Sequence, residues 1–336
     1  METTVNCYAA RTPKGKLETY SYEFPNLGAE EIEVDILNCG VCHSDLSMLD
    51  NEWGMTAYPF VPGHEAIGKI TKMGDQVKGL KVGQMVGLGW YNSSCLYCNS
   101  CLQGDHNLCG DASQTIVGHH GGFADKMRCH WLWAIPLPEG MNLKSAGPLF
   151  CGGITVFNPI VQHNIKPTDR VGVIGIGGLG HMAIQFLNKW GYHVTAFTST
   201  EGKTEEAKAL GAHQVVSSRN SSDLKKIAGS LDFILSTVNA DLDWPTYMTV
   251  LKPKGILHTV GVVPNPISIQ AFQLISGQKS LAGSPLGSPA ILRKMLEFCG
   301  HHHIEPQVEY FPMTDVNTAI EHLRSGKARY RIVLER

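Results

Sequence analysis

Four cysteines in one short segment carry the clearest chemical signal in the sequence. Cys95, Cys98, Cys101 and Cys109 follow the spacing CxxCxxCx7C within a stretch dense in small and polar residues. Four thiolates at ~2.3 Å from one ion form a closed tetrahedral shell, and short loops let the backbone wrap the metal. The alternatives are free thiols or an iron–sulfur cluster, whose motifs usually have other spacings and a following proline. The spacing predicts a structural zinc site, which stabilises a lobe and performs no chemistry.

A second set of possible metal ligands is scattered along the first part of the chain. Cys42, His64 and Cys151 stand in the runs Gly-Val-Cys-His-Ser-Asp, Gly-His-Glu and Cys-Gly-Gly. Two thiolates and one imidazole leave the fourth tetrahedral position of a zinc ion to water or substrate, as in catalytic sites. Spacing alone does not bring these residues together. Each also has an ordinary reading: a CxxC pair with Cys39, a turn cap, and a small buried side chain.

A glycine-rich turn predicts a dinucleotide-binding unit. Val171–Ile174 has the pattern of a buried strand, and His181–Trp190 has that of an amphipathic helix. Between them, glycines permit a tight turn and close approach of the backbone, while the helix N-terminus favours the charge of a pyrophosphate. A lone GxGxxG motif is weak evidence, but its place between a strand and a helix indicates dinucleotide binding. The turn residues are Gly175, Gly177, Gly178, Leu179 and Gly180.

The end of the second strand of this unit bears on the choice of cofactor. NAD enzymes of this fold place a carboxylate about 20 residues beyond the turn, on the ribose 2′-hydroxyl. This sequence has Thr198, Ser199 and Thr200 there, with Lys203 just beyond. Hydroxyl donors and a cation suit a 2′-phosphate, although Ser199 or Thr200 could instead cap the following helix. The residues at this strand end are therefore compatible with NADP(H).

The rest of the chain supplies the elements that must position these groups. The part up to about Cys151 has short alternating segments such as Glu31–Leu37, which predict a β-rich domain. Beyond Arg170, strand-like runs alternate with helical stretches and predict a doubly wound parallel sheet. These runs are Val171–Ile174, Val194–Phe197, Gln214–Val216, Phe233–Leu235, Ile256–Thr259 and Lys279–Ala282.

The C-terminal segment is predicted to pack back on the first domain. Two helices, Ile291–Phe298 and Thr314–Leu323, and a closing strand, Arg331–Leu334, come too late and are too polar-flanked for the parallel sheet. The histidine run at 301–303 is interpreted as a solvated loop after a helix. Adjacent side chains rarely converge on one metal ion.

Composition excludes several classes of protein. A chain of 336 residues, 17% charged and 43% hydrophobic, can form two ordinary domains and is not mainly disordered. A net charge of −2 lacks the basic excess of a nucleic-acid binder. The N-terminus has no signal-peptide pattern and no run reaches the ~18 apolar residues of a membrane span, so we expect a soluble, cytoplasmic protein without a membrane partner. The cytosol keeps thiols reduced, so ten cysteines are not expected to form disulfides.

Taken in order, the motifs resemble the zinc-containing alcohol dehydrogenases of the medium-chain dehydrogenase/reductase superfamily. The similarity covers nearly the whole chain and is greatest to the cinnamyl alcohol dehydrogenase branch, particularly its bacterial broad-range aldehyde reductases. It implies an α/β fold with a GroES-like catalytic domain, residues 1–151 and 288–336, and an NADP-binding Rossmann domain, residues 152–287. It is carried by Gly63-His64-Glu65-x-x-Gly68 with Gly74 and Val77, Cys42-His43-Ser44-Asp45, the four-cysteine segment, Cys151 and the glycine-rich turn.

The resemblance also implies roles for residues around the catalytic metal. Cys42, His64 and Cys151 would bind the catalytic zinc, with Glu65 as an occasional ligand. Asp45 would orient His64 through the free ring nitrogen of the imidazole. Ser44 would begin a proton relay, which in many members ends at a histidine where this sequence has Ser47.

Further residues are expected to contact the cofactor and the substrate. By resemblance, His43 would contact the cofactor pyrophosphate, Thr155 would lie near the nicotinamide, and the run Thr198–Thr200 with Lys203 would bind the NADP phosphate. Trp53, Trp90 and Leu286 are candidates for an apolar substrate pocket, although such aromatic pairs more often belong to a core.

The implied activity is the interconversion of primary alcohols and aldehydes with NADP(H), mainly as reduction of aliphatic or aromatic aldehydes. Two zinc ions per chain and a homodimer are expected, and the catalytic zinc would polarise the aldehyde oxygen during hydride delivery. One rival is an NAD-linked polyol or secondary-alcohol dehydrogenase, a class that often lacks the third ligand cysteine or the four-cysteine segment. Another is a zinc-ribbon scaffold, which leaves the six-strand half without a role.

Overall fold

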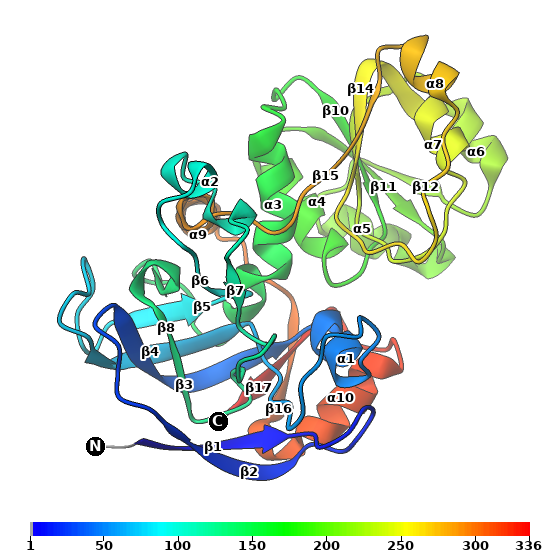
Figure 1. The fold of residues 1–336 in the computed structure, drawn as a ribbon. Coiled ribbons are helices and arrows are strands. Elements are labelled where there is room, and N and C mark those ends of the chain that lie inside the picture. The colour runs from blue at the N-terminus through cyan, green and yellow to red at the C-terminus, as the bar shows by residue number, and fades with distance from the viewer. Residues whose placement is uncertain (1–2) are drawn as a thin grey trace. The chain divides into compact units, whose positions relative to one another are not determined.

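The computed structural model describes residues 3–336, which form two compact units (Figure 1). The first unit consists of the described residues up to Ile154 together with Gly287–Arg336, and the second is Thr155–Leu286. The boundary falls within helix α3 (Gly152–Gln162), which begins directly after Cys151. The chain therefore leaves the first unit once and returns to it for its last segment.

The first unit is built on a seven-stranded sheet in which β3 (Glu31–Val41) is the longest strand. This strand pairs antiparallel with three others, β4, β8 and β17. Its apolar residues Ile32, Val34 and Ile36 are buried, as the alternation in the sequence predicted. The other elements of the unit are β1 (Thr3–Ala9), β2 (Glu18–Phe24), α1 (His43–Leu49), β4 (Ala66–Met73), β5 (Met85–Leu88), β6 (Tyr91–Ser93), α2 (Asn99–Leu102), β7 (Ser113–Gln114), β8 (Lys126–His130), β9 (Ile135–Pro136), α9 (Pro289–His302), β16 (Val308–Pro312), α10 (Val316–Arg324) and β17 (Arg331–Glu335).

The last strand of the chain lies inside this sheet. β17 pairs with β3 in a register that places Leu334 opposite Cys39 and Val333 opposite Gly40, and β16 pairs parallel with β17. Residues Ile332, Val333 and Leu334 are fully buried. Consequently a segment near residue 330 supports the same strand that leads into the candidate ligand Cys42.

The second unit contains the predicted doubly wound sheet. Its six strands are all parallel in the order β12-β11-β10-β13-β14-β15, which is the 3-2-1-4-5-6 arrangement of dinucleotide-binding folds. The prediction of six strands alternating with helices is thereby confirmed. The elements are β10 (Arg170–Ile174), α4 (Gly180–Lys189), β11 (His193–Thr198), α5 (Thr204–Ala209), β12 (Gln214–Ser217), α6 (Ser221–Lys226), β13 (Leu231–Ser236), α7 (Trp244–Val250), β14 (Leu251–Thr259), α8 (Ala271–Ile275) and β15 (Ser280–Gly283).

Helix α9 corrects one expectation from the sequence. The histidine run at 301–303 was expected to form a loop, but His301 and His302 complete α9 and His303 ends it in a left-handed conformation, φ 52°. A glycine such as Gly300 lowers the stability of a helix by only about 1 kcal/mol relative to alanine. Burial of the neighbouring Cys299 offsets that loss. With 14 residues, α9 is the longest helix described, and none in residues 3–336 combines the length and apolar character needed to cross a membrane.

Candidate metal centres and cofactor site

The scattered candidate ligands converge in the first unit. Ligand atoms of Cys42, His64, Glu65 and Cys151 all lie within 4.8 Å of one another, and all four residues are buried. Cys42 follows β3, His64 and Glu65 precede β4, and Cys151 precedes α3. Because β3 and β4 are paired, with Cys39 opposite Ala66, their ends bring the ligand-bearing loops together.

The donor set fits a zinc ion. The Sγ atoms of Cys42 and Cys151 are 3.9 Å apart. Two sulfurs bound at ~2.3 Å to one tetrahedral ion would be ~3.8 Å apart. The buried Nε2 atom of His64 and the buried Oε2 atom of Glu65 have no hydrogen-bond partner among the described residues. Unpaired buried polar atoms are costly, and a cation between them would satisfy both.

Asp45 holds the ring of His64 in one orientation. Its Oδ1 atom accepts hydrogen bonds from Nδ1 of His64 at 2.9 Å and from the backbone N–H of Gly63 at 2.8 Å. Its Oδ2 atom accepts from the backbone N–H of Cys42 at 2.9 Å. Burial disfavours the imidazolium, but Asp45 raises the pKa of His64 well above its usual value. The carboxylate thus links two ligand-bearing loops and leaves Nε2 of His64 to face the cluster.

Arg331 is a residue of the buried cluster that the sequence analysis missed. Its guanidinium forms a buried ion pair with Glu65. Burial of Glu65 outweighs this pairing and raises the pKa of that carboxyl to about 7. The pKa of Cys42 lies well below its usual value because of the hydrogen bond from Cys151 and, further, the charge of Arg331. The only signal in the sequence is an arginine that opens an otherwise apolar strand, a pattern common at exposed strand ends.

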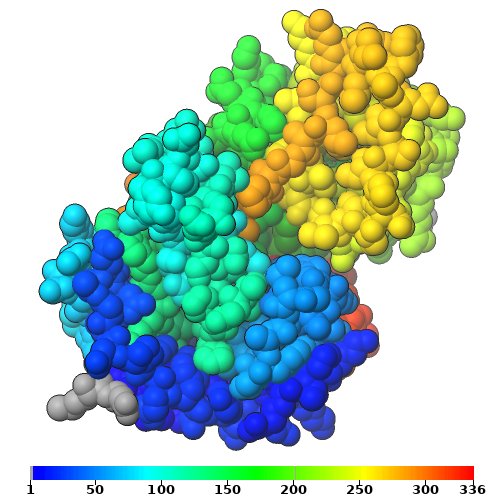
Figure 2. Space-filling model, viewed as in Figure 1, coloured from blue at the N-terminus to red at the C-terminus, as the bar shows by residue number. Residues whose placement is uncertain are grey.

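The four-cysteine segment also forms a compact cluster. Ligand atoms of Cys95, Cys98, Cys101 and Cys109 lie within 4.8 Å of one another, and Sγ of Cys95 is 3.9 Å from Sγ of Cys101. The backbone N–H of Cys98 donates to Cys95 Sγ at 3.4 Å. Such donors favour thiolates, and the backbone hydrogen bond from Tyr97 contributes most to lowering the pKa of Cys95 to about 7. The segment around α2 forms the cyan lobe of this unit in Figure 2.

The other candidate site residues of the first unit differ in their surroundings. The Ser44 hydroxyl lies 3.8 Å from Cys42 Sγ, whereas His43 is exposed and Ser47 is buried.

The Trp90 ring lies 5.0 Å from that of His64, in an edge-on arrangement. Trp53 follows at 6.2 Å from Trp90. The aromatic pair therefore extends away from a candidate zinc ligand, and both rings also pack against the core of this unit.

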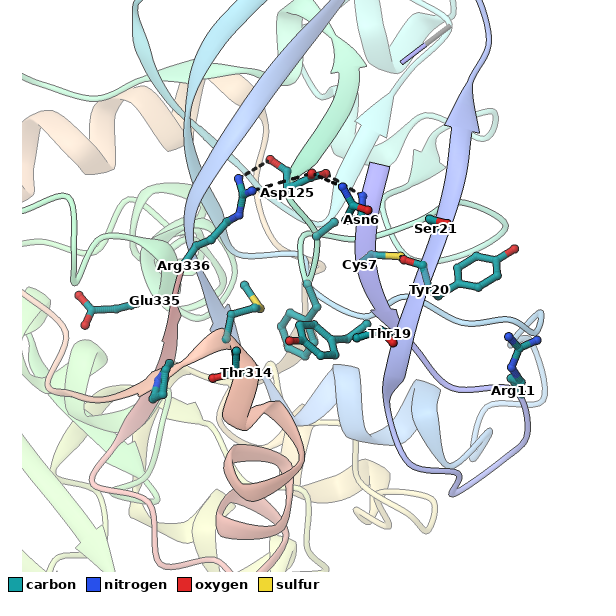
Figure 3. Close-up of a pocket in the computed structure, with 15 residues that line it drawn as sticks. Asn6, Cys7, Arg11, Thr19, Tyr20, Ser21, Asp125, Thr314, Glu335 and Arg336 are labelled. Atoms are coloured by element: carbon teal, nitrogen blue, oxygen red, sulfur yellow. Dashed lines mark hydrogen bonds and ion pairs between the residues drawn. The ribbon is translucent and has the colours of Figure 1, made fainter. Parts of the chain in front are cut away.

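A separate cavity of about 730 Å³ lies between the β1–β2 hairpin and the end of β17 (Figure 3). Its lining includes Asn6, Asp125 and Arg336 but none of the clustered candidate ligands and neither tryptophan. Asp125 accepts hydrogen bonds from the backbone and side chain of Asn6 at 2.9 and 3.0 Å, and Arg336 approaches the same carboxylate at 3.8 Å. The carboxylate of Asp125 is therefore satisfied, whereas the metal cluster leaves buried atoms of His64 and Glu65 without a partner among the described residues.

The glycine-rich turn of the second unit has the geometry that a dinucleotide phosphate requires. A Cβ atom on Gly180 would lie 1.8 Å from the carbonyl oxygen of Gly175, so only glycine lets α4 begin this close to the turn. A Cβ atom on Gly177 would meet nothing within 4 Å. Open space beside Gly177, at the N-terminal end of α4, suits close approach of a pyrophosphate. Leu179 and Gly178 are half-buried between these two positions.

The candidate 2′-phosphate residues lie at the carboxyl end of β11. The Thr198 hydroxyl accepts from the Thr200 backbone N–H at 3.1 Å and stabilises the bend, whereas Ser199 and Thr200 are exposed. Thr200 occupies the N-cap position of the following 3-10 turn but makes no side-chain cap hydrogen bond. Nζ of Lys203 donates to the carbonyl oxygen of Ile176 at 2.6 Å, which brings this cation against the glycine-rich turn.

Two further candidates are associated with the ends of this unit. Thr155 is half-buried in the first turn of α3. Leu286 follows β15, and its carbonyl oxygen accepts a hydrogen bond from Nδ2 of Asn158 at 2.6 Å. The α3 helix therefore carries Thr155 and also anchors the loop that carries Leu286.

Comparisons with known proteins agree with this arrangement. The family described as alcohol dehydrogenase GroES-like domain matches residues 28–139, and the family described as zinc-binding dehydrogenase matches residues 178–300. The chain is 52% identical over 330 residues to the aldehyde reductase AdhA of Synechocystis, covering 98% of each chain. It is 37% identical to a probable cinnamyl alcohol dehydrogenase of Pinus radiata, covering 99% of this chain and 96% of that protein.

Solved structures show the same similarity. A cinnamyl alcohol dehydrogenase of Sorghum bicolor superimposes with a TM-score of 0.94 at 37% identity, covering 99% of this chain and 98% of that one. The structure of CAD from Helicobacter pylori complexed with NADP(H) superimposes with a TM-score of 0.91 at 29% identity, covering 100% and 99%. The similarity therefore extends over both units.

Proposed function

Because the chain belongs to the zinc-binding alcohol dehydrogenase family, we propose that it interconverts primary alcohols and aldehydes with NADP(H), mainly as a broad-range aldehyde reductase. The convergence of Cys42, His64 and Cys151 with an unpartnered His64 Nε2 is the observation that carries this proposal. Three such ligands leave one tetrahedral position for substrate. The enzyme uses zinc and NADP(H), with one catalytic and one structural zinc per chain.

We assign the catalytic role to the domain of residues 1–151 and 288–336, and cofactor binding to residues 152–287. When bound, zinc supplies Lewis-acid polarisation of the carbonyl and NADPH supplies the reducing equivalent. Asp45 fixes the ring of His64, and Arg331 holds Glu65 beside the ligands. The hydroxyl of Ser44 would pass a proton to the substrate oxygen, and its distance of 3.8 Å from the Cys42 sulfur supports this role.

The cofactor is held by the second unit through its turn and the end of β11. The backbone of Gly175–Gly180 at the start of α4 would bind the pyrophosphate, with His43 as an additional contact. Thr155 would lie beside the nicotinamide. Ser199, Thr200 and Lys203 would contact the 2′-phosphate, and the exposed hydroxyls and the absence of a side-chain cap at Thr200 support this assignment. Trp53, Trp90 and Leu286 would contact the apolar part of the aldehyde.

The test compares oxidation of NADPH and NADH by the purified enzyme across a panel of aliphatic and aromatic aldehydes. Cys42→Ser is expected to lose activity, while Cys39→Ala, which changes a buried cysteine of β3 outside the cluster, should retain it. Elemental analysis should find two zinc ions per chain. Full turnover of Cys42→Ser would refute the catalytic metal, and a preference for NADH with polyols would favour the NAD-linked alternative.

We further propose that the enzyme is a cytoplasmic homodimer. None of the ten cysteines forms a disulfide bond, which suits a compartment that keeps thiols reduced. β15 is an edge strand of the parallel sheet, and its Leu281 is 39% exposed; Phe272 and Ile275 of the preceding helix α8 are 72% and 71% exposed. Figure 2 shows the segment from α8 to β15, gold to orange, on the surface of this unit. A strand with one unpaired edge and exposed apolar residues nearby is suited to pair with its copy.

Light scattering tests the dimer. Leu281→Lys, on the edge strand, should convert the protein to a monomer. Leu102→Lys, which changes a 73% exposed leucine of the four-cysteine lobe, should leave the mass unchanged. A dimer that persists in Leu281→Lys would place the interface elsewhere.

A further inference from the structure

Arg219 lies at the same edge of the sheet as the candidate 2′-phosphate residues. β11 and β12 are neighbouring parallel strands, with Thr198 opposite Ser217. Beyond this pair, the backbone N–H of Ser218 still donates to the Thr198 carbonyl oxygen at 2.9 Å. The chain at Arg219 therefore leaves the sheet beside the point where β11 turns into Ser199 and Thr200.

The guanidinium of Arg219 has no ion-pair partner within the described part of the chain. The side chain is exposed, and its backbone N–H contacts Ser217 Oγ at 3.4 Å. Acidic side chains nearby in the sequence are already paired, Asp223 with Lys226 at 2.8 Å and Glu205 with Lys208 at 2.9 Å. Among the described side chains, no carboxylate is paired with this cation, which follows the end of β12.

The other cation of this edge, Lys203, also contacts the glycine-rich turn. Nζ of Lys203 donates to the Ile176 carbonyl oxygen, which places it against the turn that would hold the pyrophosphate. A phosphate monoester carries about −1.5 to −2 charges at neutral pH, more than one lysine balances. An arginine offers two parallel N–H donors that match phosphate oxygens.

We infer that Arg219 binds the 2′-phosphate of NADP(H) and is a determinant of the preference for NADP(H) over NAD(H). The inference rests on the proposed function and adds a residue from the neighbouring strand to the phosphate site. Ser199, Thr200 and Lys203 follow β11, and Arg219 follows β12. Of the two cations, Lys203 also contacts the turn that both cofactors share, so Arg219 is the one that distinguishes them by the phosphate.

The experiment measures equilibrium binding of 2′,5′-ADP and 5′-AMP to the zinc-loaded holoenzyme by calorimetry, without turnover. The two ligands differ by the 2′-phosphate alone. Arg219→Ala should weaken binding of 2′,5′-ADP about tenfold, leave 5′-AMP unchanged and reduce the salt dependence of binding. Arg219→Lys should restore part of the loss. Lys189→Ala removes an exposed charge at the far end of α4 and should change neither ligand.

The outcomes separate the inference from the proposed function. If wild type prefers 2′,5′-ADP but Arg219→Ala retains that preference in full, the role of Arg219 is refuted and NADP use stands. If Arg219→Ala weakens both ligands equally, the side chain contacts adenine and the phosphate role is refuted as well. If wild type shows no preference for 2′,5′-ADP, both the inference and the NADP assignment fail. Zinc content and far-ultraviolet circular dichroism establish that each variant is folded.

Discussion

Nδ1 of His64 lies 2.9 Å from Oδ1 of Asp45, while Nε2 of the same ring faces the buried cluster without a hydrogen-bond partner among residues 3–336. The same carboxylate accepts the backbone N–H groups of Cys42 and Gly63. One buried side chain therefore sets the tautomer of a ligand and the separation of the two loops that carry ligands. Removal of the negative charge of Asp45 should therefore lower the affinity of the cluster for zinc.

Asp45→Asn is expected to lower the affinity of the catalytic site for zinc by about 10- to 100-fold, because the amide cannot accept from all three donors with the same strength. Competition with a chromogenic chelator measures this change, together with the zinc content after dialysis. Asp125→Asn serves as the control, since Asp125 is a buried aspartate of the same unit that contacts Asn6 rather than the cluster. Wild-type zinc affinity in Asp45→Asn would contradict the role of this hydrogen bond.

Arg331→Leu is expected to reduce the free energy of unfolding by about 3–5 kcal/mol, because it leaves the buried carboxylate of Glu65 without its partner. The double variant Arg331→Leu with Glu65→Gln should recover part of this loss, because the amide carries no charge. Urea titration of both variants and of Glu65→Gln completes the cycle. Additive losses in the double variant would show that the two side chains do not interact energetically.

We expect the second unit to lose stability at acidic pH because of His258. Its buried ring forms hydrogen bonds with Nε2 of His163 at 2.8 Å and with the Ser284 hydroxyl at 3.0 Å. Burial lowers the pKa of His258 from 6.5 to about 4. Above pH 6.5 the ring is neutral in the folded and unfolded states, so this stability is fully present. As the pH falls from 6.5 to 4, only the unfolded chain gains the proton, and stability declines by ~3 kcal/mol.

Urea unfolding at pH 7.5 and pH 4.5 measures this decline. Replacement of the titrating ring in His258→Leu should reduce the difference between the two pH values by most of that amount. His303→Leu changes an exposed histidine at the end of α9 and should leave the difference unaltered. An equal pH dependence in wild type and His258→Leu would assign the acid sensitivity to other groups.

Cys101→Ser should remove one of the two zinc ions and lower the thermal midpoint, because the closed shell of the four-cysteine lobe loses a ligand. Binding of 2′,5′-ADP should be unchanged, since the phosphate residues belong to the second unit. Elemental analysis and a thermal scan measure both effects. Cys129→Ala, a buried cysteine of β8 outside either cluster, should retain two zinc ions. Retention of both ions in Cys101→Ser would rule out a four-cysteine shell.

The sequence alone was sufficient wherever the chemistry depends on neighbours along the chain. The spacing of Cys95, Cys98, Cys101 and Cys109 limits their reach to a few residues, so their convergence is a local property that short loops can satisfy. The alternation of apolar runs likewise predicted six parallel strands and the turn between β10 and α4. Period and turn chemistry are local, and the structure bears out both.

Tertiary structure decided the groupings that span the chain. Cys42, His64 and Cys151 meet because β3 pairs with β4 and α3 begins beside them, and no spacing rule connects positions so far apart. Arg331 reaches Glu65 only because β17 pairs with β3 near the end of the chain. Such contacts depend on strand register, which is fixed by the burial of many side chains together and not by any short segment.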